Sequence, residues 1–355
     1  MQPTAAVLTH GWFSTVNAKT AHGLVRGPSR YRIVGLVDHA HAGRDAGEAL
    51  DGQRRGIPVY ADLDALLDGP AGKPDYCVVG IATPGGVLPP DFRALLLAAI
   101  ERGIGLVNGL HRFLAEDPEI AAAAARRGVE LVDIRKPKPR AELAFWSGAI
   151  RQVRAPRVAV LGTDCALGKR TTCQLLAQAC RESGLRAEVV YTGQTGWLQG
   201  LRFGFVLDST PNDFVCGELE AAIAACDREA APDVILLEGQ SALRNPSGPC
   251  GAELLLGGEA RAVVRQHAPA RRYFDSQEEL GNEIPPLADE FQLLRLYRAR
   301  VLGLALNHEG LAPEERVAVR DRLARSTGVP AVYPLLEGAG ELVPLVREVV
   351  ERARR

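Results

Sequence analysis

One glycine-rich segment combines residue types and a spacing that could bind phosphate. It reads Gly162-Thr163-Asp164-Cys165-Ala166-Leu167-Gly168-Lys169, between the apolar run RVAVL and the helical pattern CQLLAQACRESG. Glycines let backbone N–H groups turn toward anionic oxygens, the start of the helix adds the positive end of its dipole, and the lysine amine can reach the outer phosphates. The order of strand, loop and helix therefore predicts a P-loop.

The end of this segment departs from the usual P-loop pattern. Five residues separate the two glycines, and Arg170 stands where a Ser or Thr commonly binds magnesium. We expect Thr171 or Thr172 to supply that hydroxyl, and Glu238, which ends the apolar run DVILLE, to bind magnesium directly or through water. An ordinary strand-to-helix turn, with Glu238 as a capping or solvent-facing acid, is the alternative. The predicted cofactor-binding residues are Gly162, Thr163, Cys165, Ala166, Leu167, Gly168, Lys169, Arg170, Thr171 and Thr172.

Polar residues that follow neighbouring strands and open a helix are candidates for binding a substrate. GQTG follows the run AEVVYT, QSALRN follows Glu238, and PNDF opens a helix. The carboxyl ends of parallel strands meet at one edge of a sheet, so these groups are expected near the phosphate loop. Plain turns, a helix cap and a surface arginine are the alternatives, and Cys165 is expected to be a small packing residue, since no histidine lies beside it. The predicted substrate-binding residues here are Gln194, Thr195, Asp213, Gln240 and Arg244.

The N-terminal third carries a weaker ligand signal. Asp38 ends the run YRIVGLVD, as a ribose-binding acid would, but the first turn, THGWFSTVNAKTA, has no GxGxxG pattern. NAD binding is therefore not expected. Lys19 and His111 are candidates for substrate contact, with a structural or solvated role as the alternative for each.

The spacing of apolar runs predicts the elements that would position these residues. Short apolar runs alternate with helical patterns at Lys19–Arg26, Leu63–Leu67, about Pro90–Arg102 and Pro118–Arg127, which is typical of βαβ units and a parallel sheet. Prolines and basic residues then break the rhythm before it restarts at RVAVLG. We predict an α/β chain with a Rossmann-like domain at 1–137, a linker at 138–155 and a P-loop NTPase-like parallel-sheet domain at 156–355.

Composition narrows the class of function. Lys plus Arg (42) nearly equals Asp plus Glu (43), so neither nucleic acid nor an anionic membrane is expected as a partner. Seven cysteines without a CxxC pair argue against a disulfide framework and a zinc site, and no apolar run of about 18 residues occurs. We expect a cytoplasmic enzyme, forming a homo-oligomer, that acts on a small molecule.

Several stretches together resemble a known family. They are Ala18-Lys19-Thr20-Ala21, VVGIATPGG, NGLHRFLAEDPEIAAAAARRG, GTDCALGKRTT, TGQTGW and LLEGQ. In this order they resemble the DgcN-type D-glutamate N-acetyltransferase family, formerly a domain of unknown function. The stretch EGQSALRNPSGPCG suggests that this chain belongs to a divergent branch of that family. The resemblance implies a Rossmann-like domain, a P-loop domain and an amino-acid-like substrate. The GTD-x-x-x-GK loop is also similar to that of dethiobiotin synthetase, which implies that Asp164 holds a metal.

Three functions fit these residues. The first is an enzyme that uses ATP and Mg²⁺ to phosphorylate a small carboxylate for attack by an amine, with Lys169 stabilising phosphoryl charge and Arg244 or Gln194 orienting the substrate. The second is an acetyl-CoA-dependent N-acetyltransferase of D-glutamate or a related amino acid, with the P-loop holding the phosphates of coenzyme A. The third is a nucleotide-binding switch without turnover. The first needs Asp164, Thr171 and Glu238 as magnesium ligands, and the second needs a general base among His111, Glu238 and Asp213.

Overall fold

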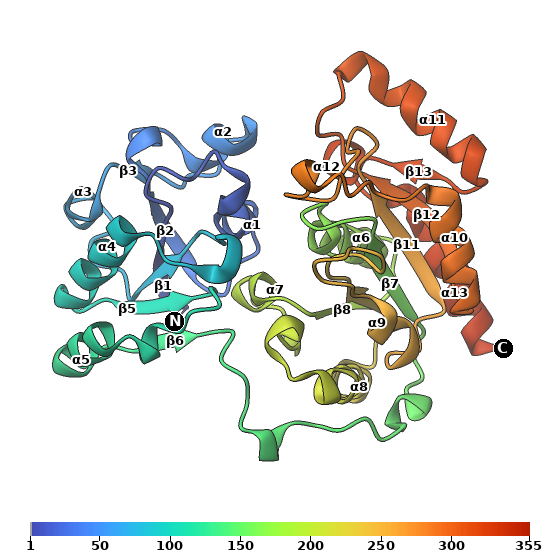
Figure 1. Cartoon of the computed structure of the whole chain (residues 1–355), viewed down its shortest axis with the longest axis horizontal. Coiled ribbons are helices and arrows are strands. Elements are labelled where there is room, and N and C mark those ends of the chain that lie inside the picture. The colour runs from blue at the N-terminus through green and yellow to red at the C-terminus, as the bar shows by residue number, and fades with distance from the viewer. Residues whose placement is uncertain (1) are drawn as a thin grey trace. The chain divides into compact units, whose positions relative to one another are not determined.

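The chain forms two α/β units (Figure 1). The computed structural model describes residues 2–355, apart from the side chain of Pro84. The N-terminal unit takes the residues up to Lys138 together with Gln194–Leu201, and the C-terminal unit takes Pro139–Gly193 and Arg202–Arg355. The chain therefore leaves the C-terminal unit after Gly193, contributes eight residues to the N-terminal unit, and returns at Arg202.

The N-terminal unit is built on a six-stranded sheet whose strands are all paired in parallel. The strand order, β3-β2-β1-β4-β5-β6, is that of a Rossmann-like sheet. Its strands are β1 (Thr4–Leu8), β2 (Arg32–Val37), β3 (Val59–Tyr60), β4 (Tyr76–Val79), β5 (Gly105–Asn108) and β6 (Leu131–Asp133). Its helices are α1 (Lys19–Arg26), α2 (Ala46–Asp51), α3 (Leu63–Leu67), α4 (Pro90–Glu101), α5 (Pro118–Arg127) and α7 (Gln194–Leu198).

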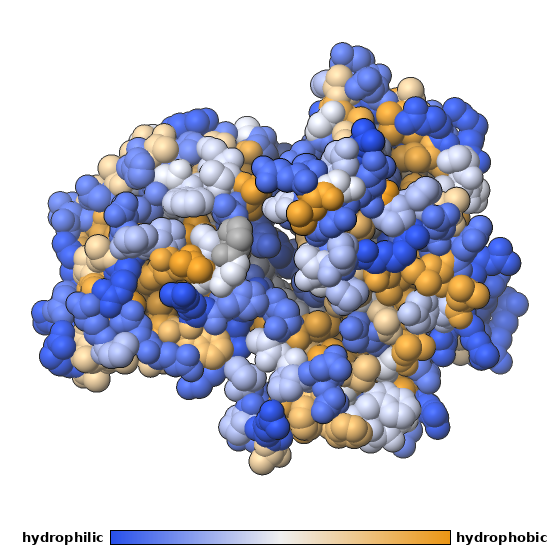
Figure 2. Space-filling model, in the orientation of Figure 1, coloured by the Kyte–Doolittle hydropathy of each residue, from blue (hydrophilic) through white to orange (hydrophobic). Residues whose placement is uncertain are grey.

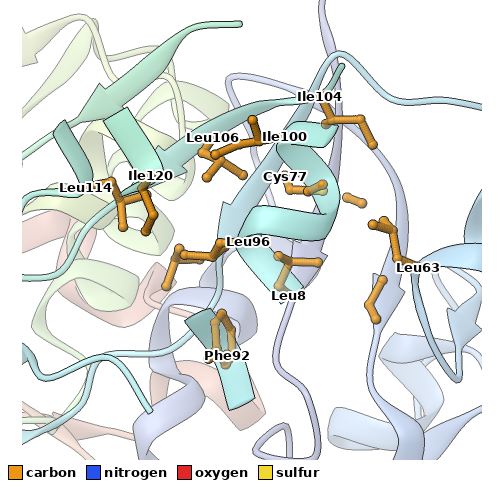
Figure 3. Packing of buried hydrophobic residues seen from close by; sticks show 14 of the residues in the cluster. Leu8, Leu63, Cys77, Phe92, Leu96, Ile100, Ile104, Leu106, Leu114 and Ile120 are labelled. Atoms are coloured by element: carbon orange, nitrogen blue, oxygen red, sulfur yellow. The ribbon is translucent and has the colours of Figure 1, made fainter. Parts of the chain in front are cut away.

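Apolar side chains fill both faces of this sheet, as expected for parallel strands covered by helices. On one face, Phe92, Leu96 and Ile100 of α4 belong to the same buried cluster as Leu8 of β1 and Leu106 of β5 (Figure 3). The cluster on the other face includes side chains from α1, α2 and α7, with Leu198 fully buried. The inserted segment therefore completes the core of the N-terminal unit.

The C-terminal unit is built on a seven-stranded parallel sheet with the order β13-β12-β11-β7-β10-β8-β9. Both parallel sheets confirm the predicted fold class. The strands are β7 (Arg157–Gly162), β8 (Ala187–Tyr191), β9 (Phe203–Gly204), β10 (Val234–Glu238), β11 (Ala262–His267), β12 (Arg300–Leu306) and β13 (Ala331–Val332). The helices are α6 (Lys169–Glu182), α8 (Asn212–Ala230), α9 (Ala252–Leu256), α10 (Leu287–Leu296), α11 (Arg316–Thr327), α12 (Pro334–Glu337) and α13 (Val343–Arg354).

The stretch predicted as a linker packs against α8 of the C-terminal unit. The carboxylate of Glu220 accepts hydrogen bonds from the amides of Ser147, at 2.8 Å, and Ile150, at 3.0 Å. Gly217 lies so close to this stretch that an added Cβ would stand 2.1 Å from the carbonyl oxygen of Ala144. The chain from Pro139 onward is thus an ordered part of the C-terminal unit.

The surface mixes residue types. On the face that Figure 2 shows, apolar residues are scattered among hydrophilic ones in both units. Among residues 2–355, none of the helices has the length and apolar character needed to cross a bilayer.

Candidate functional site

The phosphate loop joins the central strand β7 to helix α6, as the sequence predicts. Gly168, the last residue before the helix, has a φ of +100°, a conformation that favours glycine. An added Cβ at Gly162 would stand 2.8 Å from the Lys169 Nζ atom, so glycine is required for the lysine to fold over the loop. Lys169 is 6% exposed, and its Nζ donates to the backbone carbonyl of Asp164 at 2.6 Å. Burial lowers the pKa of Lys169 to about 8.

A glutamine of the neighbouring strand fixes the shape of the loop. The backbone carbonyl of Gln266, in β11, accepts from the Thr163 amide at 3.0 Å, and its side chain donates to the Leu167 carbonyl at 3.0 Å. The Thr172 hydroxyl donates to Gln266 Oε1 at 2.6 Å. Thr172 is therefore engaged in scaffolding, which leaves Thr171 as the better-placed hydroxyl for a ligand.

Asp164 is fully buried beneath a set of nitrogen donors. Its carboxylate accepts from Arg271 Nη1 at 3.0 Å, from the Asp275 amide at 2.7 Å and from Asn245 Nδ2 at 3.1 Å. A guanidinium in contact with a carboxylate competes with a divalent cation for the same charge. The arrangement therefore suits Asp164 to holding the loop in place better than to binding magnesium. Among residues 2–355, no three His, Cys, Asp or Glu side chains gather in a group that could hold a metal ion.

Glu238 ends β10 beside the P-loop and is buried. Its Oε2 atom accepts from the Thr192 amide at 3.1 Å, and the Thr192 hydroxyl donates to the Glu238 carbonyl at 2.7 Å. Burial raises the pKa of Glu238, although the nearby charges of Arg170 and Lys169 and the amide hydrogen bonds oppose the shift. Gln240 donates to the Thr192 hydroxyl at 3.0 Å, so it lies at the same edge of the sheet.

Arg244 belongs to a buried charge cluster that the sequence alone did not indicate. Its Nε donates to Glu290 Oε1 at 2.7 Å, while Arg265 of β11 pairs with the other oxygen of the same carboxylate. Arg265 is 0% exposed and Glu290 is 2% exposed. Two guanidinium groups thus share one buried carboxylate, with the exposed Asp289 at 3.6 Å from Arg244. Within residues 2–355, the Arg265 Nε and Nη1 atoms and the Arg244 Nη2 atom are buried without a hydrogen-bond partner.

The other predicted residues divide between the two units. Cys165 lies in the loop with its thiol 3.3 Å from the Ser241 hydroxyl, and Asp213 is exposed in the first turn of α8, where Pro211 holds the N-cap position. Gln194 and Thr195 are buried in the N-terminal unit, not in the unit that carries the P-loop. Lys19 and His111 are exposed residues of that same N-terminal unit.

Two family models match this chain. A P-loop domain, described as the C-terminal domain of DUF1611 (a domain of unknown function), matches residues 144–343, and the N-terminal Rossmann-like domain of DUF1611 matches residues 39–137. The chain belongs to the DUF1611 family. This confirms the resemblance that its motifs indicate.

Curated relatives and a solved structure resemble the chain along most of its length. A D-glutamate N-acetyltransferase of Tritonibacter scottomollicae is 31% identical over 281 residues, covering 77% of this chain and 81% of the relative. A second, from a Pseudoalteromonas species, is 30% identical over 273 residues, covering 75% and 79%. The crystal structure of a DUF1611 protein from Anabaena variabilis has a TM-score of 0.87 at 30% identity and covers 98% of this chain and 99% of its own.

Proposed function

We propose that this protein is an N-acyltransferase that moves an acetyl group from acetyl-CoA to the amino group of D-glutamate or a related acidic amino acid. The two relatives with that activity in their names, each matching about three quarters of the chain, support the reaction class. The observation that carries the choice of an acidic substrate is the Arg244 guanidinium. Its side chain is 30% exposed and its Nε donates to Glu290, while within residues 2–355 its Nη2 atom has no hydrogen-bond partner.

Arginine is the side chain best suited to recognise such a substrate. A planar guanidinium donates two parallel hydrogen bonds to a carboxylate, and each of these bonds is stronger than a neutral one. In Arg244, the Nη2 atom is the donor that has no partner within residues 2–355. In the proposed site, Arg244 contacts a substrate carboxylate and Arg265 keeps Glu290 in place behind it.

Glu238 is the best-supported general base among the three candidates. The amino group of an amino acid is protonated near neutral pH and must lose a proton before it attacks a thioester. A carboxylate with a raised pKa is a stronger base than an ordinary one, and burial raises the pKa of Glu238. His111 and Asp213 are exposed, whereas Glu238 is buried at the end of a strand beside the P-loop.

The P-loop is suited to hold the phosphates of coenzyme A. Lys169 and Arg170 add two cations to the loop amides at the start of α6, and this combination binds phosphate in many proteins. Bound acetyl-CoA would supply the acyl group as a thioester. The side chains of this chain then bind, orient and deprotonate the amine.

An ATP- and Mg²⁺-dependent reaction is the second candidate, and the strand, loop and helix ending in Lys169 favour it. Its magnesium site would rest on Thr171 and Glu238, because the Asp164 carboxylate is paired with Arg271. A metal-dependent phosphoryl transfer therefore has fewer free ligands here than the sequence pattern predicts.

Calorimetric titration separates the two candidates. The protein and its Lys169→Ala variant are titrated with acetyl-CoA and, separately, with ATP plus MgCl₂. Micromolar binding of acetyl-CoA that Lys169→Ala weakens by about 100-fold or more supports acyl transfer, since removing a charged hydrogen bond costs about 3 kcal/mol. Binding of ATP only in the presence of magnesium, without binding of acetyl-CoA, would overturn the proposal and favour phosphoryl transfer.

A further inference from the structure

Three side chains of the N-terminal unit form a continuous hydrogen-bonded chain of acid, base and alcohol. The Asp38 Oδ1 atom lies 2.8 Å from the His41 Nδ1 atom, and the His41 Nε2 atom lies 2.7 Å from the Ser14 hydroxyl oxygen. Ser14 is exposed, the His41 side chain is 12% exposed, and Asp38 is fully buried. Exposure thus increases from the acid to the alcohol, as it must when only the alcohol meets a reactant.

The surroundings of Asp38 determine which nitrogen of His41 carries the proton. Its Oδ2 atom accepts from the Thr9 hydroxyl and the Gly11 amide, each at 2.8 Å, and from the Phe13 amide at 3.2 Å. Burial alone would raise the pKa of Asp38, but the hydrogen bonds from His41, Thr9 and the two amides outweigh it and lower the pKa. An ionised carboxylate accepts a hydrogen bond from the Nδ1–H group of His41, so Nε2 is left to accept a hydrogen bond from the Ser14 hydroxyl.

Adjacent strands and a helix start position the three groups. Asp38 follows β2 and Ser14 lies in the loop after β1, and these two strands are paired in parallel, so both residues stand at the carboxyl edge of the sheet. The chain runs from Ser14 into the 3-10 helix η1 (Val16–Ala18).

We propose that Ser14, His41 and Asp38 form a second acyl-transfer site, which takes an activated acyl group, an ester or a thioester, and is independent of the P-loop. The Ser14 oxygen attacks the acyl carbonyl while His41 Nε2 takes the hydroxyl proton. The carbon–oxygen bond of an acyl-serine forms, the bond to the alcohol or thiol breaks, and His41 returns the proton to that leaving group. Water or an amine then attacks the acyl-serine by the reverse route and restores the hydroxyl.

The arrangement also bears on the weak nucleotide signal at this strand end. In a dinucleotide fold the acid in the position of Asp38 accepts from a ribose hydroxyl. Here both oxygens of Asp38 are occupied by donors from the protein, three of them in the segment Thr9–Phe13. Asp38, which the sequence suggests as a weak nucleotide-binding signal, therefore orients His41 in this arrangement.

A serine-directed fluorophosphonate probe tests this proposal on the full chain. The expected result is one adduct on the peptide that contains Ser14, absent from Ser14→Ala and formed at least about 100-fold more slowly in His41→Gln, since a general base contributes about 10²–10⁴ in rate. Ser326→Ala, which removes an exposed hydroxyl bonded only to the Leu323 carbonyl, is the matched control and should label like the unaltered protein. With 4-nitrophenyl acetate, Ser14 should gain one acetyl group in the first turnover.

The controls distinguish this site from the P-loop and from loss of folding. Lys169→Ala should label Ser14 at the unaltered rate, so failure of the function proposed for the P-loop would not affect this result. Circular dichroism establishes that His41→Gln is folded, and Asp38 is left unchanged because its buried hydrogen bonds hold the first loop. No adduct on Ser14 of the folded protein, or an equal labelling rate in folded His41→Gln, would overturn the proposal.

Discussion

Removing the negative charge of Glu290 should weaken the C-terminal unit strongly. Glu290 is the buried carboxylate shared by Arg244 and Arg265, and Arg265 is 0% exposed on the central strand β11. Glu290→Gln keeps the shape but leaves a buried guanidinium without a counter-charge. Breaking one partner of a buried pair typically costs about 3–5 kcal/mol. In the native protein burial lowers the pKa of Arg265 to about 9, the Arg244 charge adding to the shift, so the cluster depends on this one acid.

Hydrogen exchange measured by mass spectrometry reports this loss of stability separately for the C-terminal unit. For peptides covering β11, the expected fall in protection is between about 10² and 10⁴, the range that corresponds to about 3–5 kcal/mol of opening free energy. Peptides of β1 and β4 in the N-terminal unit serve as the internal reference. Glu283→Gln, which breaks an exposed pair with Arg272, is the matched control and should change stability by less than about 1 kcal/mol. A change below about 1 kcal/mol in Glu290→Gln would refute the reasoning.

Three further predictions concern the loop, the linker and a helix cap. Because Lys169 has a pKa of about 8 and a bound anion would raise it, acetyl-CoA affinity should fall as pH rises above about 8 in titrations from pH 7 to 9.5, and Lys169→Ala should lack this slope. Gly217→Ala, which drives a Cβ into the Ala144 carbonyl, should cost about 1–3 kcal/mol in thermal unfolding, whereas Gly340→Ala, with open space around its Cβ, should cost little. The Asp45 carboxylate accepts hydrogen bonds from four backbone amides, which together lower its pKa although burial opposes the shift. Asp45→Asn should therefore lower the free energy of unfolding at neutral pH, and this difference from the unaltered protein should fade below about pH 4.

Sequence periodicity predicted the local elements well because parallel strands are strongly apolar. Helices at Lys19–Arg26, Leu63–Leu67 and Pro118–Arg127 have the predicted bounds, and the P-loop lies between a central strand and a helix as expected. The short α2 (Ala46–Asp51) and the two-residue strand β3 (Val59–Tyr60) had no distinct pattern. Elements this short contain too few residues to show a period.

The contacts of the candidate site were harder to predict from sequence, because the residues that contact one another come from distant parts of the chain. Asp164 was expected to hold a metal, but Asn245 and Arg271, which lie far along the chain, occupy its carboxylate. One signal was present, since Arg265 follows the apolar residues that begin the interior strand β11, and a buried charge there requires a partner. Nothing local identified Glu290 as that partner.

The segment around Gln194 shows a different limit. It follows β8 of the P-loop sheet, which predicts that Gln194 lies with the phosphate loop. The Leu198 side chain is buried in the N-terminal unit, and the Gln199 amide donates to the Gly23 carbonyl at 2.8 Å, so the segment belongs to the core of that unit. Which unit this segment joins depends on the core in which its apolar side chain is buried, and strand order alone does not specify that.

A turnover assay measures the proposed acetyl transfer to an acidic amino acid itself. The purified protein is incubated with acetyl-CoA and D-glutamate, free coenzyme A is followed with a thiol reagent, and the product is identified by mass spectrometry. We predict N-acetylglutamate formed in equal amount to coenzyme A, without ATP or magnesium. We also predict a loss of about 100-fold in kcat/KM for Arg244→Ala, because a hydrogen bond between charged groups is worth up to about 3 kcal/mol. No acetylated product with either enantiomer of glutamate or of aspartate, from protein that binds acetyl-CoA, would contradict the account.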